Sequence, residues 1–438
     1  MNYSIRRIIS ISFLLLFLLE TAPCKLLKHS FITLAESDEI ITITKDDEKS
    51  LYEAVQTLNK SGGTIYIDTP VINISNKNTL DLSGTIAGGI VGKKQSDGSY
   101  PRLDFKKARN SGSNARGITI RGSNLFVKYL IIENAGDNGI WIGGNKNTID
   151  HVITRYNNDT GIQLSNNAAE NTLNYCYSYR NCDIPTFGGN ADGFAPKLGV
   201  GKTVFNYCFA WENSDDGWDS YDKEGNISQD VSYFHSATWH NGNPDIFTGK
   251  YDYDNGKPLD KNMWAVQQLM ESDPNFESNY NNKKFNIDNG KINGVSAKEW
   301  FSQAIGAMNG NGLKFGSKFT PQNSSIKRTA EWCVVFDHKN KGFDNNGSQK
   351  CTGYFTNNVS FNNNINYQLP YSFSKWENNW SWGAKSKEQN NMNQSLKKPS
   401  NANSATKIFY SVRDQIIKAV YANTFPTVTF DDAIKKLN

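Results

Sequence analysis

Acidic residues recur in one stretch, Gly189–Tyr221, at a fixed offset from a glycine. Asp192 and Asp216 are each followed by Gly and an aromatic residue, and Asp215 and Asp219 flank the second unit. If the two glycines lie at equivalent places on adjacent turns of a stacked β structure, Asp192 lies about 4.8 Å from Asp216. Carboxylates this close repel one another unless a cation binds them, and several hard oxygen ligands suit Ca²⁺. The sequence therefore predicts a Ca²⁺ site formed by Asp192, Asp215, Asp216 and Asp219.

Short sequence blocks repeat around this stretch and indicate its architecture. Each block has an apolar residue, a polar residue, a Tyr or His and an apolar residue in turn. The blocks begin 22, 24, 32 and 26 residues apart, at Val127, Ile149, Leu173, Phe205 and Val231. Helical periodicity is absent from them, and a β-propeller needs longer repeats of four strands. The pattern predicts an all-β fold, a right-handed parallel β-helix in which each repeat is one coil of a solenoid.

The fourth position of each block predicts an inward-facing column of side chains. This column is formed by Leu130, Val152, Cys176, Cys208 and Phe234. We expect Cys176 and Cys208 to be stacked core thiols rather than a disulfide. The other cysteines beyond the N-terminal region are too few and too irregular for a disulfide scaffold, although one or two disulfides remain compatible: Cys182, Cys333 and Cys351.

Helical patterns occur at both ends of the predicted coil stack. The pattern over Asp46–Lys60 predicts a helix that feeds the strand Gly62–Ile67 and caps the N-terminal end. Its apolar face is formed by Leu51, Ala54, Val55 and Leu58. Ile408–Val420 and Asp431–Leu437 are expected to be C-terminal helices that cover the other end of the stack.

The N-terminal segment has the pattern of a signal peptide. Arg6 and Arg7 precede the apolar run Ile8–Leu19, which is too short to span a membrane. We interpret residues 1–22 as the signal peptide and expect cleavage between residues 22 and 35. The sequence thus predicts a secreted, extracellular protein with no membrane span.

The rest of the chain divides by composition and rhythm. Residues 36–380 are expected to form the β-helix catalytic domain, with an excursion from the coils at 241–309. Within the excursion, local helices are expected at Asn262–Met270 and Ser296–Ile305, and its place beside the acidic residues makes it a candidate rim of a cleft. Residues 381–438 are interpreted as a low-complexity linker and C-terminal helices that pack on or near the β-helix.

Composition and charge exclude some classes of partner. Hydrophobic residues make up 37% of the chain, and the net charge is +4 with a pI near 8.5. This balance is compatible with a polyanionic substrate, but no basic cluster is present to indicate nucleic acid binding. A monomer is expected.

A lysine falls into the same surface column as one of the predicted metal ligands. Two residues after the glycine, successive coils present Trp141, Gln163, Ala195, Asp219 and Lys314. A uronic-acid carboxylate bound to Ca²⁺ makes the proton on its adjacent carbon more acidic, and a neutral amine nearby can remove it. We expect Lys314 to be exposed and to contribute little to folding or metal binding. Ca²⁺ and partial burial are expected to lower its pKa.

Three runs of sequence resemble the motifs of polysaccharide lyase family 9. They are Asn190–Lys197 (NADGFAPK), Ala210–Asp219 (AWENSDDGWD) and Gly310–Phe315 (GNGLKF). Ile118–Gly144 and Lys341–Asp344 are similar to the family as well. The resemblance implies a secreted pectate lyase of right-handed β-helix fold that acts on polygalacturonate or pectin. It also implies that Asp192, Asp215, Asp216 and Asp219 hold Ca²⁺ and that Lys314 is the Brønsted base.

The resemblance therefore predicts cleavage of (1→4)-α-D-galacturonan by Ca²⁺-assisted β-elimination, which gives 4,5-unsaturated oligogalacturonides. We assign Lys197 to binding of the substrate carboxylate, and it is the second candidate for the base. Two other functions remain open: a polygalacturonase-type hydrolase, and a non-catalytic Ca²⁺-dependent pectin-binding β-helix. The alignment of Lys314 with the acidic residues argues against both.

Overall fold

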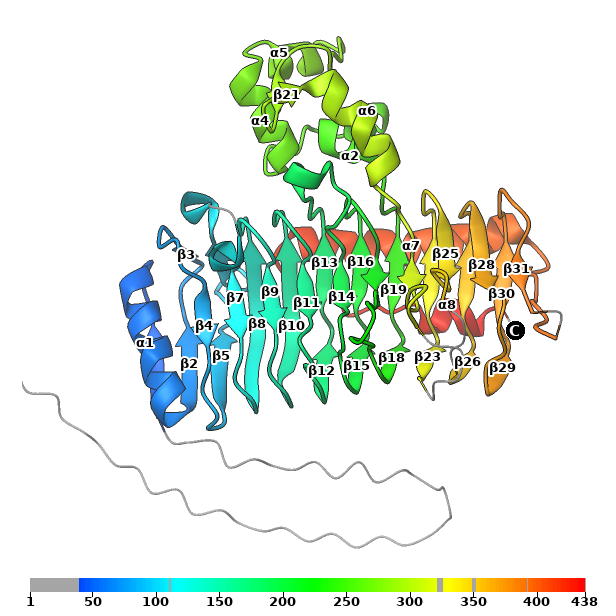
Figure 1. Ribbon diagram of the computed structural model, residues 1–438. Coiled ribbons are helices and arrows are strands. Elements are labelled where there is room, and N and C mark those ends of the chain that lie inside the picture. The colour runs from blue at the N-terminus through cyan, green and yellow to red at the C-terminus, as the bar shows by residue number, and fades with distance from the viewer. Residues whose placement is uncertain (1–38, 110–111, 321–325, 349–351, 392, 438) are drawn as a thin grey trace, which may run out of the picture. The chain divides into compact units, whose positions relative to one another are not determined.

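Parallel strands form three rows that wind into successive coils (Figure 1). The computed structural model describes residues 39–109, 112–320, 326–348, 352–391 and 393–437. The predicted signal peptide, residues 1–22, and Cys351 lie outside these residues. Glu36–Asn438 forms one compact unit.

The first two rows merge into one 19-stranded sheet because β8 (Leu125–Glu133) and β10 (Thr148–Arg155) each run through both. Besides the first halves of β8 and β10, row 1 contains β1 (Ile40–Ile43), β2 (Gly63–Ile67), β5 (Gly88–Gly92), β12 (Asn171–Asn174), β15 (Thr203–Asn206), β18 (Val231–Phe234), β23 (Arg328–Glu331), β26 (Tyr354–Thr356) and β29 (Lys375–Glu377). Besides their second halves, row 2 contains β3 (Val71–Asn73), β6 (Arg102–Asp104), β13 (Tyr177–Tyr179), β16 (Phe209–Trp211), β19 (Ala237–Trp239), β24 (Val334–Phe336), β27 (Val359–Phe361) and β30 (Trp380–Trp382).

Row 3 is a separate 10-stranded parallel sheet, and it carries the acidic residues. Its strands are β4 (Leu80–Leu82), β7 (Ile118–Ile120), β9 (Ile140–Ile142), β11 (Ile162–Leu164), β14 (Phe194–Pro196), β17 (Trp218–Asp219), β22 (Leu313–Lys314), β25 (Lys341–Asp344), β28 (Ile365–Leu369) and β31 (Gln389–Asn390). Short 3-10 turns connect strands at Lys106–Ala108, Ser113–Ala115 and Ile184–Thr186. The all-β parallel coil architecture predicted from the sequence blocks is confirmed.

The Tyr or His of each of the first four blocks makes the corner between rows 1 and 2. Each of these residues has a positive φ, a left-handed conformation that is unfavourable for residues other than Gly. Their rings stack from coil to coil, with centroids 4.7 Å apart for His151 and Tyr175 and 4.9 Å apart for Tyr175 and Tyr207. Ring stacking of this kind offsets part of the backbone cost, which explains why the third position repeats.

The fifth block is out of register with the sequence prediction. Tyr233, rather than Val231, pairs with Phe205, so His235 takes the corner and Phe234 lies half-buried beside the sheet. Ser236 occupies the position predicted for Phe234, and its Oγ accepts a hydrogen bond from the Cys208 N–H at 3.2 Å. The block slips by two residues because the Tyr233 ring stacks on Phe205 inside the coil, with centroids 5.6 Å apart.

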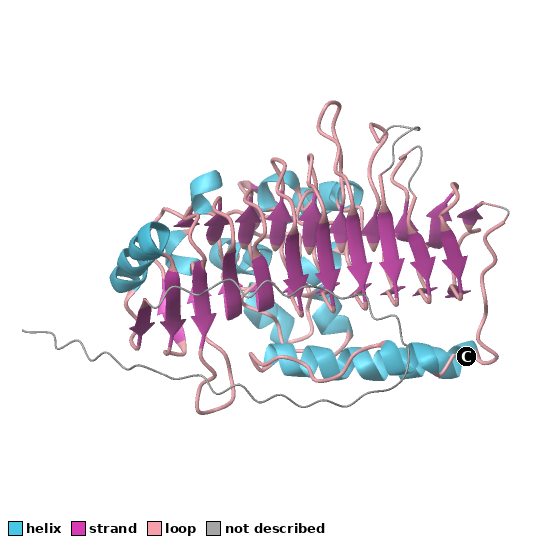
Figure 2. Ribbon diagram, turned by 90° about the horizontal axis from the view of Figure 1, so that it is seen from below, coloured by secondary structure: helices cyan, strands magenta, loops and turns pink. Residues whose placement is uncertain are grey.

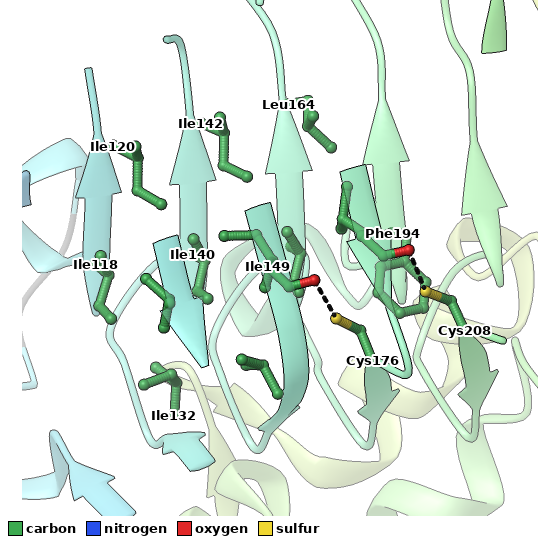
Figure 3. Packing of buried hydrophobic residues seen from close by; sticks show 14 of the residues in the cluster. Ile118, Ile120, Ile132, Ile140, Ile142, Ile149, Leu164, Cys176, Phe194 and Cys208 are labelled. Atoms are coloured by element: carbon green, nitrogen blue, oxygen red, sulfur yellow. Dashed lines mark hydrogen bonds between the residues drawn. The ribbon is translucent and has the colours of Figure 1, made fainter. Parts of the chain in front are cut away.

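The cysteines of the described ranges are all free and buried. The Cys176 thiol donates to the Ile149 carbonyl at 3.6 Å, and the Cys208 thiol donates to the Leu173 carbonyl at 3.4 Å (Figure 3). These two thiols lie inside the coil among apolar side chains, as predicted. The prediction of stacked thiols rather than a disulfide is confirmed.

Helix α1 (Glu48–Ser61) covers the first coil (Figure 1). Asp47 caps it by accepting a hydrogen bond from the Ser50 N–H. The four residues predicted for its apolar face are all buried: Leu51, Ala54, Val55 and Leu58.

The excursion between β19 and β22 is mainly helical. It contains α2 (Pro244–Thr248), α3 (Lys250–Asp254), α4 (Trp264–Ser272), α5 (Phe276–Asn281), a hairpin of β20 (Lys291–Ile292) and β21 (Val295–Ser296), and α6 (Ala297–Ala307). Helices α4 and α6 lie within two residues of the predicted ones, whereas α5 and the hairpin occupy a stretch that reads as loop. Arg180 anchors the excursion to the coils by ion pairs with Asp252 at 3.3 Å and Asp260 at 2.5 Å.

The C-terminal helices differ from the prediction in their position. Helix α7 (Ala402–Tyr421) runs alongside the strands instead of covering the last coil, and α8 (Asp431–Lys435) follows it (Figures 1 and 2). The Phe409 ring of α7 lies 5.5 Å from the Phe361 ring, and the Tyr421 ring of α7 lies 5.2 Å from the Tyr179 ring. The outward-facing aromatic side chains of row 2 provide the apolar surface that α7 requires.

The stretch predicted to be a low-complexity linker contributes to the last coil instead. Strand β31 pairs with β28, Trp376 donates to the Ser395 carbonyl at 2.8 Å, and Leu396 packs against the interior cluster. In the part of the chain that the structure describes, no helix is long and apolar enough to cross a membrane.

A buried asparagine ladder sets the spacing of the coils beside row 3. The Asn157, Asn181 and Asn213 backbone N–H groups each donate to the side-chain oxygen of the Asn on the next coil, at 3.1, 3.2 and 2.8 Å. Asn241 continues the ladder, and its N–H donates to His338 Nδ1 at 3.4 Å. Each Asn side chain thus satisfies backbone groups that would otherwise be buried without a partner.

Replacing Asn213→Ala should therefore destabilise the coils. The buried N–H of Asn181 loses its acceptor, which costs about 1–3 kcal/mol for a buried donor. The free energy of unfolding, measured by urea titration, should fall by at least this amount. The exposed Asn289→Ala is the matched control and should unfold as the wild type does; equal stability of the two variants would contradict a structural role for the ladder.

Candidate functional site

Asp192 and Asp216 lie over one another at the start of row 3, as the repeat predicts. The Gly193 N–H donates to the Asp216 carbonyl at 2.9 Å, and Phe194 pairs with Trp218. Glycine is required here because a Cβ on Gly217 would lie 2.1 Å from Thr238 Oγ1. The close approach of the coils thus explains the glycine after each Asp.

One oxygen of each stacked acid is used to orient it. Asp192 Oδ1 accepts from the Asp216 N–H at 3.2 Å, and Asp216 Oδ1 accepts from the Asn311 N–H at 2.7 Å. Asp215 Oδ1 accepts from the Asn309 N–H, where the excursion rejoins the coil, at 2.9 Å. The backbone of the next coil therefore holds each carboxylate in place. The second oxygen of Asp192 accepts a hydrogen bond from Thr160 Oγ1 at 3.3 Å and lies 3.5 Å from Lys197, and the second oxygen of Asp216 pairs with Lys314.

Three of the four predicted ligands converge. Asp192, Asp216 and Asp219 are buried, and each offers a carboxylate oxygen such that these atoms lie within 4.8 Å of one another. Within the described ranges, Asp216 Oδ2 and Asp219 Oδ1 have the Lys314 ammonium as their partner, at 2.7 and 3.4 Å. Three buried carboxylates, two of whose oxygens are paired with a single ammonium, fit a hard divalent cation such as Ca²⁺.

Asp215 lies beside this group rather than in it. It is 4% exposed and lines the same cavity as Asp219 and Lys314. Its proposed role as a ligand is thus compatible with its position.

Burial and mutual repulsion act on the acids of the site. Burial raises the pKa of Asp192, Asp215 and Asp216 above the ordinary value, and neighbouring carboxylates add to this effect. The nearby lysines oppose it. Burial also raises the pKa of another acid, Asp159, to about 7, although the charge of Lys197 acts to lower it.

Lys314 lies one coil beyond Asp219, in direct register with it. The predicted column is confirmed, but Lys314 is not an exposed lysine, because it is only 7% exposed and ion-paired with Asp216. Burial alone would lower the pKa of Lys314, yet Asp216 and Asp219 lie so close that its pKa is raised well above the ordinary value. Without a bound cation the pKa of Lys314 is thus raised, and its lowering by Ca²⁺ stays a prediction.

Lys197 approaches the acids from the other side. Its Nζ lies 3.5 Å from Asp192 Oδ2, and this side chain is 16% exposed. Burial would lower the pKa of Lys197, but Asp192 and Asp219 raise it above the ordinary value. Both lysines are thus held protonated by the acids.

A cavity of about 390 Å³ lies against the site and is lined by Lys197, Asp215, Asp219 and Lys314. Sequence reasoning gave no role in the site to several residues that line this cavity, among them Tyr221, Lys223 and Asn309. Tyr221 is the last residue of the acidic stretch and Lys223 lies two residues beyond it, so their proximity in sequence to the acids could have indicated them. The sequence contains no such signal for Asn309, because the position of this residue depends on where the excursion rejoins the coils.

Comparison with known proteins identifies the family. The model described as "Pel9A-like, right handed beta helix region" matches residues 30–257, more than half of the chain. The chain belongs to this family. The predicted resemblance to polysaccharide lyase family 9 and the right-handed coil are confirmed.

Curated relatives carry the name pectate lyase. The chain is 36% identical over 262 residues to "Pectate lyase L" of Paenibacillus polymyxa (strain SC2), which covers 57% of this chain and 58% of the relative. It is 27% identical over 285 residues to "Pectate lyase L" of Dickeya chrysanthemi, covering 64% and 50%. The chain thus spans about half the length of these relatives.

Solved structures show the same fold. The crystal structure of pectate lyase Pel9A matches with a TM-score of 0.54 and 21% identity, covering 84% of this chain and 82% of that one. A rhamnogalacturonan lyase matches with a TM-score of 0.56 and 17% identity, covering 87% and 92%. At these identities the likeness concerns the fold alone.

Replacing Asp216→Asn should weaken binding of Ca²⁺ by at least about tenfold, because one of the converging charges is lost while shape is retained. Calorimetry with the metal measures this change. Asp245→Asn, at a half-exposed acid outside the cavity, is the control and should keep the wild-type affinity. Unchanged affinity in Asp216→Asn would exclude this cluster as the metal site.

Replacing Lys314→Met should have the opposite effect on the metal. The ammonium competes with a bound cation for Asp216 and Asp219, so its removal should tighten Ca²⁺ binding by about tenfold or more. The metal-free variant should melt at a lower temperature, because the buried acids lose their main counter-charge. Wild-type affinity and melting temperature in this variant would show that the ion pair contributes to neither the free energy of metal binding nor that of unfolding.

Proposed function

We propose that this protein is a secreted pectate lyase that cleaves (1→4)-α-D-galacturonan by β-elimination. Asp192, Asp216 and Asp219 would hold Ca²⁺, with Asp215 beside them, and Lys314 is the proposed base. Lys197 is proposed to bind a substrate carboxylate. The names of the relatives and the family membership support the reaction class.

One observation carries the proposal: a buried lysine lies in register with a buried acid, next to two more acids on adjacent coils. A binding module has no need for a lysine at 2.7 Å from Asp216 inside the cluster. Glycoside hydrolases act with two carboxyl groups as acid and as base or nucleophile, whereas here a lysine that is ion-paired with Asp216 and Asp219 lies among the acids. The geometry therefore favours elimination over hydrolysis or simple binding.

In the proposed reaction the Lys314 amine accepts the proton from C5 of a galacturonate. The C5–H electron pair forms the C4–C5 double bond, the bond from C4 to the glycosidic oxygen breaks, and that oxygen takes a proton from solvent. Ca²⁺ bound among the acids would supply a Lewis acid that withdraws charge from the substrate carboxylate. Lys314 serves as a base only when its own proton is lost, so Asp216 and Asp219 must face another cation first.

Lys314→Ala should lower turnover on polygalacturonate by at least about 10²-fold, the usual scale for a lost general base. Lys314→Arg should be nearly as inactive, because Arg gives up its proton far less readily. The measurement is the ultraviolet absorbance of the unsaturated product, with chelator as the negative control and circular dichroism as the check on folding.

Other outcomes would assign a different function. Reducing ends without ultraviolet absorbance would indicate a hydrolase, and neither signal would indicate a binding protein. Ordinary activity of Lys314→Ala together with an inactive Lys197→Ala would move the base to Lys197.

A further inference from the structure

A second cavity lies on the other side of the α6 C-terminus from the catalytic cavity. Its volume is about 800 Å³, roughly twice the 390 Å³ of the catalytic cavity. Three parts of the chain form it: the corner between rows 2 and 3 at His240 and Asp337, the excursion at Lys250, and α7 at Arg413. None of these parts contributes to the metal cluster.

The two cavities are neighbours. Ile305 lines the second cavity and Asn309 lines the catalytic one. Ile305 lies in the last turn of α6, and Asn309 lies two residues beyond the end of this helix. Lys339 fixes this dividing wall, because its Nζ donates to the Met308 carbonyl at 2.6 Å and to the Ile305 carbonyl.

The lining of the second cavity is positively charged. It contains four cations, Lys250, Lys339, Lys385 and Arg413, and only two acids, Asp245 and Asp337. Lys250 and Asp245 are 3.6 Å apart and both about half exposed, so water screens their attraction. Lys385 is exposed, and within the described ranges its ammonium forms no ion pair. The lining therefore carries a net charge of +2. Lys339 already donates to two carbonyls and Arg413 also pairs with Asp414 at 2.9 Å, so Lys385 is the cation most open to a ligand.

Polar and ring groups accompany these charges. Tyr251 packs edge-on against His240, with ring centroids 4.4 Å apart, and Asn362 donates to the Tyr410 hydroxyl at 3.2 Å. Arg413 lies 3.9 Å from Asp337 and stacks on the Tyr410 ring at 4.2 Å. Clefts of this size with a few convergent polar groups are the usual form of a ligand site.

We propose that this cavity binds a second, carboxylate-bearing stretch of the same polysaccharide chain, several sugars away from the bond that is cleaved. The inference rests on the proposed function for the identity of the polymer. A galacturonan carries one carboxylate on every sugar, so a strand that leaves the catalytic cavity across the α6 C-terminus meets Lys385 and Arg413. A neutral polysaccharide would gain nothing from these charges.

The consequence is a preference for long substrates. An oligomer that is bound in the catalytic cavity alone makes no contact with the second cavity, whereas a long chain engages both and gains from the second contact. The contact is remote from the reacting bond and equally strong throughout the reaction, so it should lower KM and leave kcat unchanged.

The test compares Lys385→Glu with Lys387→Glu, an equally exposed lysine two residues away that does not line the cavity. For Lys385→Glu, KM on polygalacturonate should rise at least about fivefold, with kcat and the kinetics on trigalacturonate unchanged. Lys387→Glu should match the wild type on both substrates. An equal change in both variants would point to general surface charge, and no change in Lys385→Glu, or an equal change on both substrates, would overturn the proposal.

A binding measurement separates this inference from the proposed function. Calorimetry in chelator, where the proposed reaction stops, should show that a long oligogalacturonide binds the wild type more tightly than it binds Lys385→Glu. If the wild type forms no unsaturated product but this difference persists, the lyase function fails and the cavity stands. If product forms but binding does not differ, the cavity proposal fails alone.

Discussion

The close approach of successive coils at their glycines is the constraint on which the site depends. An added Cβ would lie 2.8, 2.7 and 2.5 Å from the next coil's carbonyl at Gly193, Gly217 and Gly312 respectively. No other residue allows this spacing without displacing a strand. The same approach places Asp192 over Asp216 and brings Lys314 beside Asp219. The positions of the charged side chains in the site therefore depend first on how closely the backbones of successive coils pack.

Charge balance is the second determinant of the site. Buried carboxylates on adjacent coils are costly unless a cation is present, and in this structure two lysines supply it. An ion pair of this kind keeps the acids folded into the site, but it also holds the proposed base in its protonated form. Folding without metal and the proposed catalysis with a bound cation thus require different partners for the same acids.

Much of this arrangement could be predicted from the sequence because a β-helix converts spacing along the chain into position. The offset from Gly to Asp219 and to Lys314 was enough to place both in one column. The fifth block was misplaced because Val231 and Tyr233 both fit an apolar inward position, and only ring stacking decides between them. The burial of Lys314 and the place of α7 depend on contacts between distant segments, which local patterns do not contain.

Helix α7 has a consequence for how the protein unfolds. A solenoid is coupled only between neighbouring repeats, so its end coils can fray one at a time. Here Phe409 contacts Phe361 near one end of the helix, and Tyr421 contacts Tyr179 near the other. The helix thus links coils that do not touch one another, and the last coils cannot separate without loosening the middle ones. This long-range link makes the stack a cooperative unit in place of a chain of independent steps.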